Sequence, residues 1–381
     1  MRDEGIPVIE PAARVGDPVE AIDTPALVID ADAMERNIAA MAGFARERGL
    51  KLRPHAKTHK CAALARLQIE AGAVGVCVQK LGEAQALAAG GVRDIYVSNE
   101  VIAPQKLARL AMLAHQVKLA LAVDSLQGIE QLALALQPSP ASIDVFIEID
   151  VGQGRCGAAP GQVAQLARAV QARAGAGLRL GGLQAYHGGA QHLRTAAERQ
   201  AAIAQAAESV RTALATLRAA GIECPLVTGA GSGSFVFEAA SGLWGELQAG
   251  SYLFMDRDYA DNEPAPGAPR FEHALFVKSS VISRGASHAV VDAGHKSHAV
   301  DSGLPRVWGA ALDFTNGGDE HGIVRGRPGE PLPDLGATVW LVPGHCDPTV
   351  NLHDHYVLVR GGLAAGRVAS ILPIDARGAI R

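Results

Sequence analysis

The sequence has few cysteines, few aromatic residues and no run of one charge, and each absence excludes a class of protein. Its five cysteines are scattered and form no Cys-x-x-Cys pair, which argues against a disulfide framework or a structural zinc cluster. Aromatic residues make up 4% of the chain, the formal net charge is -4, and there is no Lys/Arg run to bind nucleic acid or an anionic membrane. We therefore expect a small-molecule partner.

A long uninterrupted apolar run is also missing. Residues 1–7 lack the basic start and apolar stretch of a signal peptide. The most apolar stretch, residues 107–123, is interrupted by Arg109, His115 and Lys118, so it does not resemble a membrane span. The sequence thus predicts a cytoplasmic protein.

What the sequence does contain is a regular alternation of strand-like and helix-like segments. At 381 residues the chain is long enough for two domains, or for one barrel with an appendage. A leading strand at 26–30 is followed by further short apolar runs at 50–53, 74–78, 94–97, 118–123, 143–149, 180–186, 226–228 and 247–254. Eight such runs, with no Gly-x-Gly-x-x-Gly turn after the first strand, favour a (β/α)₈ TIM-type barrel over a doubly wound sheet.

The pattern changes after a turn-rich linker at residues 261–269. The segments that follow alternate as short strands without long helices, which is typical of an all-β domain. We therefore predict an α/β chain with its barrel in residues 25–262 and a mainly antiparallel β domain in residues 263–381.

In such a barrel, residues that follow the strands gather at one mouth. We expect this of Lys57, Gln79, Asn99, Arg155, His187 and Gly231. Lys57 lies between His55 and His59, and neighbouring positive charge with partial burial lowers the pKa of an amine, which as a neutral group attacks carbonyls. A solvated lysine, or one paired with a carboxylate, is the alternative interpretation.

Three other strand ends carry residues suited to binding or proton transfer. The small residues of segment 228–235 can close around a phosphate, although a flexible loop has the same composition. In segment 150–157 a glycine-rich turn presents Arg155, which is suited to an anionic oxygen or is simply solvated. The run 186–192 offers a phenol and two imidazoles for proton transfer or for the wall of a ring-binding site, and each also has ordinary structural uses.

The predicted β domain contains a concentration of His, Cys and Asp in segment 343–355. On an extended strand His345 and Asp347 would point to one side and leave coordination positions open for water and substrate. Imidazole with carboxylate suits Mn²⁺, Mg²⁺ or Zn²⁺. His353 and His355 alternate in the same way and are alternative or supporting ligands, while a solvated turn is the other interpretation.

Taken in order, these segments resemble the D-threonine aldolase and D-serine dehydratase family. The resemblance rests on residues 54–60, the Gly-x-Gly-Arg-x-Gly turn at 152–157, the loop at 228–233 and Pro-Gly-His-Cys-Asp at 343–347. It spans nearly the whole chain, and its order matches the alanine-racemase-type fold (fold type III) of pyridoxal-phosphate enzymes. It implies a β domain that includes part of the N-terminal segment 1–24, and a homodimer with active sites near the subunit interface.

The resemblance also implies roles for individual residues. Lys57 takes the Schiff-base position of pyridoxal 5'-phosphate, and Arg155 falls where the family contacts the phenolic oxygen of that cofactor. The phosphate loop corresponds to Thr228, Gly231, Ser232 and Gly233; further cofactor contacts are Gln79, Tyr186 and Tyr252; and the metal pair corresponds to His345 and Asp347.

The metal pair separates two branches of the family. At the metal site, the dehydratase branch is typified by His-x-Cys with zinc and the aldolase branch by His-Cys-Asp. This chain has the second pattern. The resemblance therefore implies retro-aldol cleavage of a D-β-hydroxy-α-amino acid of the D-threonine or D-3-hydroxyaspartate type to glycine and an aldehyde. One candidate for the base that removes the β-hydroxyl proton is His59, which lies two residues from Lys57. His192 and a metal-bound water are the rival candidates, and the sequence does not rank them.

Three other functions remain open at this stage. A dehydratase of the same family would release a keto acid and ammonia. A non-catalytic pyridoxal-phosphate carrier would need no metal segment, and a racemase would need a second acid or base from the β domain. Product analysis separates all of them.

Overall fold

The computed structural model describes residues 10–137 and 141–381, which form two compact units. The barrel unit contains residues 38–252, 259–270 and 378–381. The sheet unit contains the described residues up to 37 together with 253–258 and 271–377. Of the predicted N-terminal segment 1–24, residues 1–9 lie outside the described part. Among the described residues, no helix is both long and hydrophobic enough to span a bilayer.

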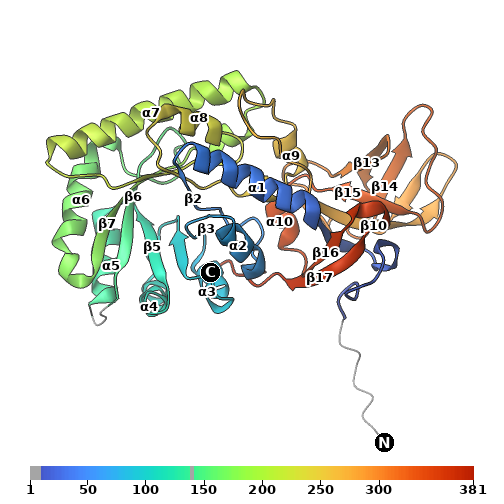
Figure 1. Ribbon diagram of the computed structural model, residues 1–381, viewed down its shortest axis with the longest axis horizontal. Helices are drawn as coiled ribbons and strands as arrows, with labels where there is room; N and C mark the ends of the chain where they lie inside the picture. The colour runs from blue at the N-terminus through green and yellow to red at the C-terminus, as the bar shows by residue number, and fades with distance from the viewer. Residues whose placement is uncertain (1–9, 138–140) are drawn as a thin grey trace, which may run out of the picture. The chain divides into compact units, whose positions relative to one another are not determined.

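The barrel unit is built on eight parallel strands with helices between them (Figure 1). The strands are β2 (Lys51–Leu52), β3 (Val76–Val78), β4 (Asp94–Val97), β5 (Lys118–Val123), β6 (Ile143–Glu148), β7 (Leu178–Ala185), β8 (Val227–Gly229) and β9 (Glu246–Leu247). Their order is β2-β9-β8-β7-β6-β5-β4-β3, and a parallel bridge between His55 and Cys77 joins the two ends. The predicted barrel is confirmed, although β9 is far shorter than the predicted run 247–254.

The helices follow the strands in sequence and begin at recognisable signals. They are α2 (Ala62–Glu70), α3 (Leu81–Ala89), α4 (Pro104–Leu113), α5 (Leu126–Leu136), α6 (Val163–Ala172), α7 (Ala196–Ala219) and α8 (Phe235–Ser241), with 3-10 turns η2 (Pro160–Gln162), η3 (Ala174–Ala176), η4 (Gly188–His192) and η5 (Ser251–Leu253). Thr195 and Glu198 form a reciprocal capping box before α7. The Ser125 hydroxyl accepts the Gly128 N–H at 3.2 Å and caps α5.

Alternation along each strand separates the inside of the barrel from the outer core. Ile95 and Val97 of β4 pack into the core between strands and helices. Tyr96 between them points the other way, and its ring centroid lies 4.9 Å from that of Phe146. The inside of the barrel is therefore filled by side chains, and the room for a ligand is at the ends of the strands.

The sheet unit contains a nine-stranded, mainly antiparallel sheet, as predicted. Its strands are β1 (Ala26–Asp30), β10 (Leu275–Arg284), β11 (Ala289–Val291), β12 (Arg306–Val307), β13 (Leu312–Asn316), β14 (Gly322–Gly326), β15 (Thr338–Val342), β16 (His355–Arg360) and β17 (Arg367–Pro373). The main path runs β13-β14-β11-β10-β1-β16-β17, and β15 pairs with β10 and β12. The short helical elements are η1 (Val19–Ala21), α10 (Cys346–Val350) and α11 (Gly362–Ala365). Two helices cross the unit boundaries, α1 (Ala31–Glu47) and α9 (Arg257–Ala260).

One strand lies in a different sheet from the one the sequence suggested. β1, which the sequence analysis included in the barrel segment 25–262, pairs antiparallel with β10 and parallel with β16. Val28 of this strand packs with Val357 and Val359, and with Val19 and Ile22 of the N-terminal segment. A buried apolar strand followed by a helix has the same local pattern in either sheet, because its pairing partners are distant in sequence.

Candidate functional site

A cavity of about 420 Å³ lies at the C-terminal ends of the barrel strands, and Lys57, Gln79, Arg155 and Tyr186 line it together. They follow β2, β3, β6 and β7, so the barrel joins residues that are far apart in the sequence. Among the described residues, Asn99 also lines this cavity, whereas His187 and Gly231 do not. The volume falls within the roughly 300 to 1,000 Å³ typical of small-molecule sites.

The segment that carries Lys57 contains three lysines in different environments. Lys51 is exposed on β2, and Lys60 is buried in an ion pair with Glu83. Lys57 is the lysine of this segment that lines the cavity. Lys60 has a φ of 53°, a left-handed conformation, at the turn before α2. The side chain of Lys60 therefore lies in the protein interior, and that of Lys57 lies at the cavity.

His55 lines the same cavity as Lys57 and has two polar neighbours there. Gln79 Nε2 lies 3.0 Å and Ser98 Oγ 3.2 Å from His55 Nε2. These two contacts hold the imidazole at the wall of the cavity. The effect of neighbouring positive charge on the Lys57 amine stays a prediction.

Arg155 is held at the cavity by a shaped turn and two neighbours. The Asp150 carboxylate accepts the N–H groups of Gly152 and Gly154 at 2.9 and 3.1 Å, which fixes the turn and lowers the pKa of Asp150. The Arg155 guanidinium lies 3.7 Å from Glu148 Oε1 and 5.7 Å from the centroid of the Tyr186 ring. Arg155 is thereby presented as a cation at the wall of the cavity.

The glycine-rich loop after β8 is shaped from inside by Gln191, which the sequence analysis did not single out. Gln191 Oε1 accepts the Gly233 N–H at 3.0 Å, and Gln191 Nε2 donates to Ser234 Oγ at 2.6 Å. A Cβ on Gly231 would lie 2.3 Å from Gln191 Oε1, so a side chain there would displace the Gln191 amide. No local pattern marks Gln191, because its role depends on a loop about 40 residues away in sequence.

Two predicted cofactor residues have side chains buried in internal hydrogen bonds. Thr228 Oγ1 donates to Glu246 Oε1 at 2.8 Å and accepts from Gln248 Nε2 at 2.7 Å. The Tyr252 hydroxyl accepts from Gln68 Nε2 at 2.9 Å, and burial raises its pKa. These side chains belong to the network that supports the strand ends.

The two candidate histidine bases differ in exposure. His59 is fully buried, and its Nδ1 accepts the Cys61 N–H at 3.1 Å, so the ring proton of neutral His59 is on Nε2. His192 is exposed, and its ring centroid lies 5.5 Å from that of Tyr259. An exposed imidazole exchanges protons with water more readily than a buried one.

In the sheet unit, His345 and Asp347 come together, but not on the predicted extended strand. β15 ends at Val342, His345 is the N-cap of α10, and Asp347 lies in the first turn. His345 Nε2 and Asp347 Oδ1 are 3.9 Å apart. Pro348 and an acidic residue in the first turn are signals for a helix start, and they outweigh the strand-like alternation.

The strongest electrostatic feature of this segment is the group of carboxylates that act on His345. Burial lowers the pKa of His345, but Asp347, Asp301 and Asp256 outweigh burial and raise it. Cys346 is buried, and burial raises the pKa of its thiol, so it is a neutral core residue. An environment this acidic favours a bound cation.

His353, another histidine of the segment, already has a hydrogen-bond partner. His353 Nε2 donates to the Ser297 carbonyl at 2.8 Å, and burial lowers the pKa of His353.

A further residue at His345 is one that the sequence does not indicate. Asp301 Oδ2 lies 2.6 Å from His345 Nδ1. Asp301 is 44 residues from His345 in sequence, so no motif spacing indicates it.

The residues present fit the two groups that the sequence suggests. Within the described ranges, no group of three or more His, Cys, Asp or Glu side chains could hold a metal by itself. His345 and Asp347 offer one nitrogen and one oxygen, so they fit an open catalytic ion rather than a closed structural one. In the barrel unit, a lysine, an arginine and a phenol at one cavity fit a carbonyl cofactor with anionic oxygens.

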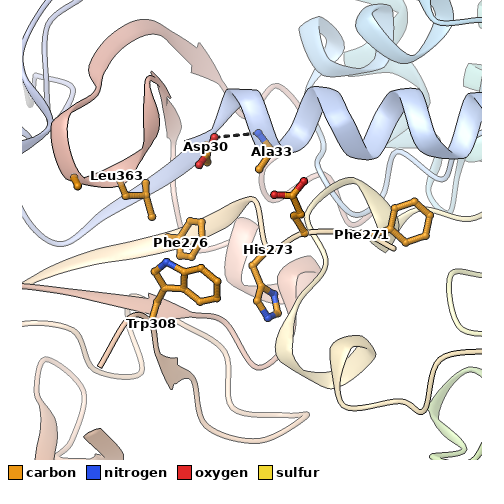
Figure 2. A pocket seen from close by; sticks show the side chains of 9 residues that line it. Asp30, Ala33, Phe271, His273, Phe276, Trp308 and Leu363 are labelled. Carbon is orange, nitrogen blue, oxygen red and sulfur yellow. Dashed lines mark hydrogen bonds between the residues drawn. The ribbon is translucent and has the colours of Figure 1, made fainter. Parts of the chain in front are cut away.

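A second cavity, of about 470 Å³, lies in the sheet unit and contains no predicted site residue (Figure 2). The Trp308 ring centroid lies 5.6 Å from those of Phe276 and His273 on one side of it. Asp30 at its edge accepts the Ala33 N–H at 3.0 Å and caps α1. Its polar groups therefore serve the local fold.

Comparisons with known proteins find matches to two successive parts of the chain. Residues 29–258 match the family "Alanine racemase, N-terminal domain", and residues 274–359 match "Putative serine dehydratase domain". The D-threonine aldolase of an Arthrobacter species is 47% identical over 372 residues, which cover 97% of each chain. The 3-hydroxy-D-aspartate aldolase of Paracoccus denitrificans (strain Pd 1222) is 42% identical over 366 residues, 94% of this chain and 92% of that protein. The crystal structure of D-threonine aldolase from Filomicrobium marinum has a TM-score of 0.93 at 45% identity, covering 98% of this chain and 100% of that one.

The barrel, the lysine at the end of its first strand and the attached sheet define an alanine-racemase-type protein. Within that class, the chain belongs to the D-threonine aldolase and D-serine dehydratase family. The resemblance found in the sequence is thus confirmed, and the family implies pyridoxal phosphate as cofactor.

Proposed function

We propose that this protein is a lyase that cleaves D-β-hydroxy-α-amino acids of the D-threonine or D-3-hydroxyaspartate type to glycine and an aldehyde. Relatives at 47% and 42% identity over nearly the whole chain carry the names of such aldolases. The observation that carries the choice of reaction is the meeting of His345 Nε2 and Asp347 Oδ1 at 3.9 Å. An oxygen ligand at Asp347, instead of a thiolate, favours Mn²⁺ or Mg²⁺, with Zn²⁺ possible.

In the barrel unit, the residues that line the cavity would hold the cofactor. Pyridoxal phosphate supplies, when bound, an electron sink for the pair released as a bond to the substrate Cα breaks. The Lys57 amine would be the covalent attachment point, Arg155 would contact the phenolic oxygen, and Gln79 and Tyr186 would line the site of the ring. For the phosphate we propose the loop residues Gly231, Ser232 and Gly233. Thr228 and Tyr252, whose side chains are used in internal hydrogen bonds, would support this loop.

In the sheet unit, His345 and Asp347 would hold the divalent ion. The chemistry that such an ion supplies is a lowered pKa of a coordinated hydroxyl group, which makes the β-hydroxyl of the substrate easier to deprotonate. The reaction balances in three changes. The β-hydroxyl loses its proton, the Cα–Cβ bond is cleaved to release the aldehyde, and Cα gains a proton to give glycine. The carboxylates of Asp301 and Asp256, which act on His345, would also favour the positive charge of such an ion.

For the residue that removes the β-hydroxyl proton, the choice is between His59 and His192. We propose His192, since it is exposed, whereas His59 is buried and its Nδ1 is used by Cys61. Turnover of the His192→Ala and His59→Ala variants separates the two, because loss of activity in the His59 variant alone contradicts this assignment.

The alternative is dehydration to a keto acid and ammonia, which the match of residues 274–359 to a serine dehydratase domain favours. The test is product analysis on a panel of D-β-hydroxy amino acids, with and without a chelator. Glycine and an aldehyde that disappear with the chelator are expected. A keto acid with ammonia in their place contradicts the aldolase assignment.

From the family resemblance we also propose that the protein is a homodimer. Analytical ultracentrifugation measures the oligomeric state directly.

A further inference from the structure

His345 has two ring nitrogens with different surroundings. Its Nδ1 lies 2.6 Å from Asp301 Oδ2 and 3.5 Å from the hydroxyl of Ser302, while its Nε2 lies 3.9 Å from Asp347 Oδ1. The short contact with Asp301 is the dominant one at Nδ1. The imidazole therefore has a carboxylate on each of its two nitrogens, at different distances.

The Asp301 contact decides which nitrogen carries the proton of neutral His345. An ionised carboxylate only accepts hydrogen bonds, and Asp301 Oδ2 lies 2.6 Å from His345 Nδ1, within hydrogen-bond distance. His345 Nδ1 must then donate, which leaves the lone pair on Nε2, the nitrogen beside Asp347. A metal-ligating histidine often donates its other N–H to a carboxylate in this manner.

The loop that carries Asp301 is fixed to the helix that carries His345. The Ala299 N–H donates to Thr349 Oγ1 at 3.0 Å, and Thr349 Oγ1 donates to the His345 carbonyl at 2.7 Å. A Cβ on Gly344 would lie 2.1 Å from the Gly303 carbonyl oxygen, so the two segments pass in direct contact. Asp301 is thus held against His345 by backbone packing on both sides of it in sequence.

The other acidic neighbour of His345 has a different task. Asp256 Oδ2 accepts the Cys346 N–H at 2.9 Å and is fully buried, so it holds the start of α10. Asp301 is the acidic neighbour with a hydrogen bond to the imidazole itself. Asp256 therefore positions the backbone, and Asp301 positions the ring.

We infer that Asp301 is a positioning residue that fixes the ring orientation and tautomer of His345, so that Nε2 is available to a divalent ion. The inference rests on the metal pair of the proposed function. It adds a third residue, distant in sequence, to the two that the motif contains. Asp301 supports the affinity for the ion without contacting it.

The test measures Mn²⁺ binding by calorimetry on enzyme loaded with pyridoxal phosphate. Asp301→Ala is expected to bind Mn²⁺ about 10- to 100-fold more weakly than the parent, while the cofactor absorbance is unchanged. Asp301→Asn keeps an oxygen that accepts the N–H, so it should recover part of that loss. Asp313→Ala is the matched control, because Asp313 is an exposed aspartate paired with Arg327 in the same unit.

A second measurement needs no variant at Asp301. Nitrogen NMR of histidine-labelled, metal-free enzyme at alkaline pH reports which nitrogen of His345 carries the proton, with His345→Ala used for assignment. A proton on Nδ1 is expected, and a proton on Nε2 overturns the inference, as does parent-like Mn²⁺ affinity in Asp301→Ala. If His345→Ala binds Mn²⁺ as the parent does, the metal pair itself fails, which is a separate outcome from failure of the Asp301 inference.

Discussion

The barrel unit and the sheet unit hold their candidate functional residues in different ways. In the barrel unit, Lys57, Arg155 and Tyr186 follow three different strands, and parallel pairing brings them to one cavity. In the sheet unit, His345 and Asp347 are close in sequence, and Asp301 of a separate loop lies 2.6 Å from His345 Nδ1. The barrel topology thus brings the residues of the cavity together. The metal pair is instead a short sequence motif, and we infer that the orientation of its histidine depends on one hydrogen bond.

The largest expected effect is the loss of Lys57, which tests whether the barrel cavity carries the covalent chemistry. Lys57→Ala should lower turnover by at least about 10³-fold, because an alanine offers no amine to attack the cofactor carbonyl. Turnover and the visible absorbance of bound cofactor are the measurements. Lys51→Ala is the control, since Lys51 is exposed on β2, the strand that precedes Lys57. Parent-like turnover in Lys57→Ala would contradict the assignment of the covalent chemistry to the barrel cavity.

A smaller effect is expected from His345→Ala, which tests whether the sheet unit acts on the reaction and not on the cofactor. Turnover should fall by at least about 10²-fold, because the ion loses its nitrogen ligand, and the cofactor absorbance should stay unchanged. His321→Ala is a matched control, because His321 is exposed directly before β14 in the same unit. Loss of cofactor absorbance in His345→Ala would mean that the two units do not divide the work in this way.

The smallest expected effect concerns the pH dependence of stability in the barrel unit. Burial, together with the charge of Glu100, raises the pKa of Glu148 to about 8. Between its ordinary value and about 8, the folded state keeps a proton that the unfolded state releases, so this contribution to stability is lost as the pH rises. In Glu148→Gln, which mimics the neutral acid, the fall in melting temperature over this range should be weaker.

Asp150 gives the control for that measurement because its pKa shifts the other way. Hydrogen bonds from Gly154 and Gly152 lower the pKa of Asp150, so its contribution is present at neutral pH and is lost as the pH falls through the lowered value. Asp150→Asn should therefore flatten the acid side of the stability profile and leave the alkaline side unchanged. A parent-like alkaline slope in Glu148→Gln contradicts the role given to Glu148.

Much of the barrel could be predicted because strands and helices have local periodicities. Tyr96 alternates with Ile95 and Val97, and this period of two is visible in the sequence. β1 has the same local pattern, and its place beside β10 and β16 could not be predicted, since strand partners are set by non-local packing. The helical position of Asp347 was missed because a two-residue alternation is too short to define a strand, and Pro348 indicates a helix start.

The sequence by itself determined the barrel, the family and the residues that its motifs contain, including Lys57, Arg155, His345 and Asp347. Hydrophobic periodicity and motif chemistry are local properties, so they can be read along the chain. The tertiary structure alone decided that Lys60 is paired while Lys57 lines the cavity, and that Asp301 lies within hydrogen-bond distance of His345. These facts depend on hydrogen bonds and burial between distant segments, and only the folded chain brings those segments together.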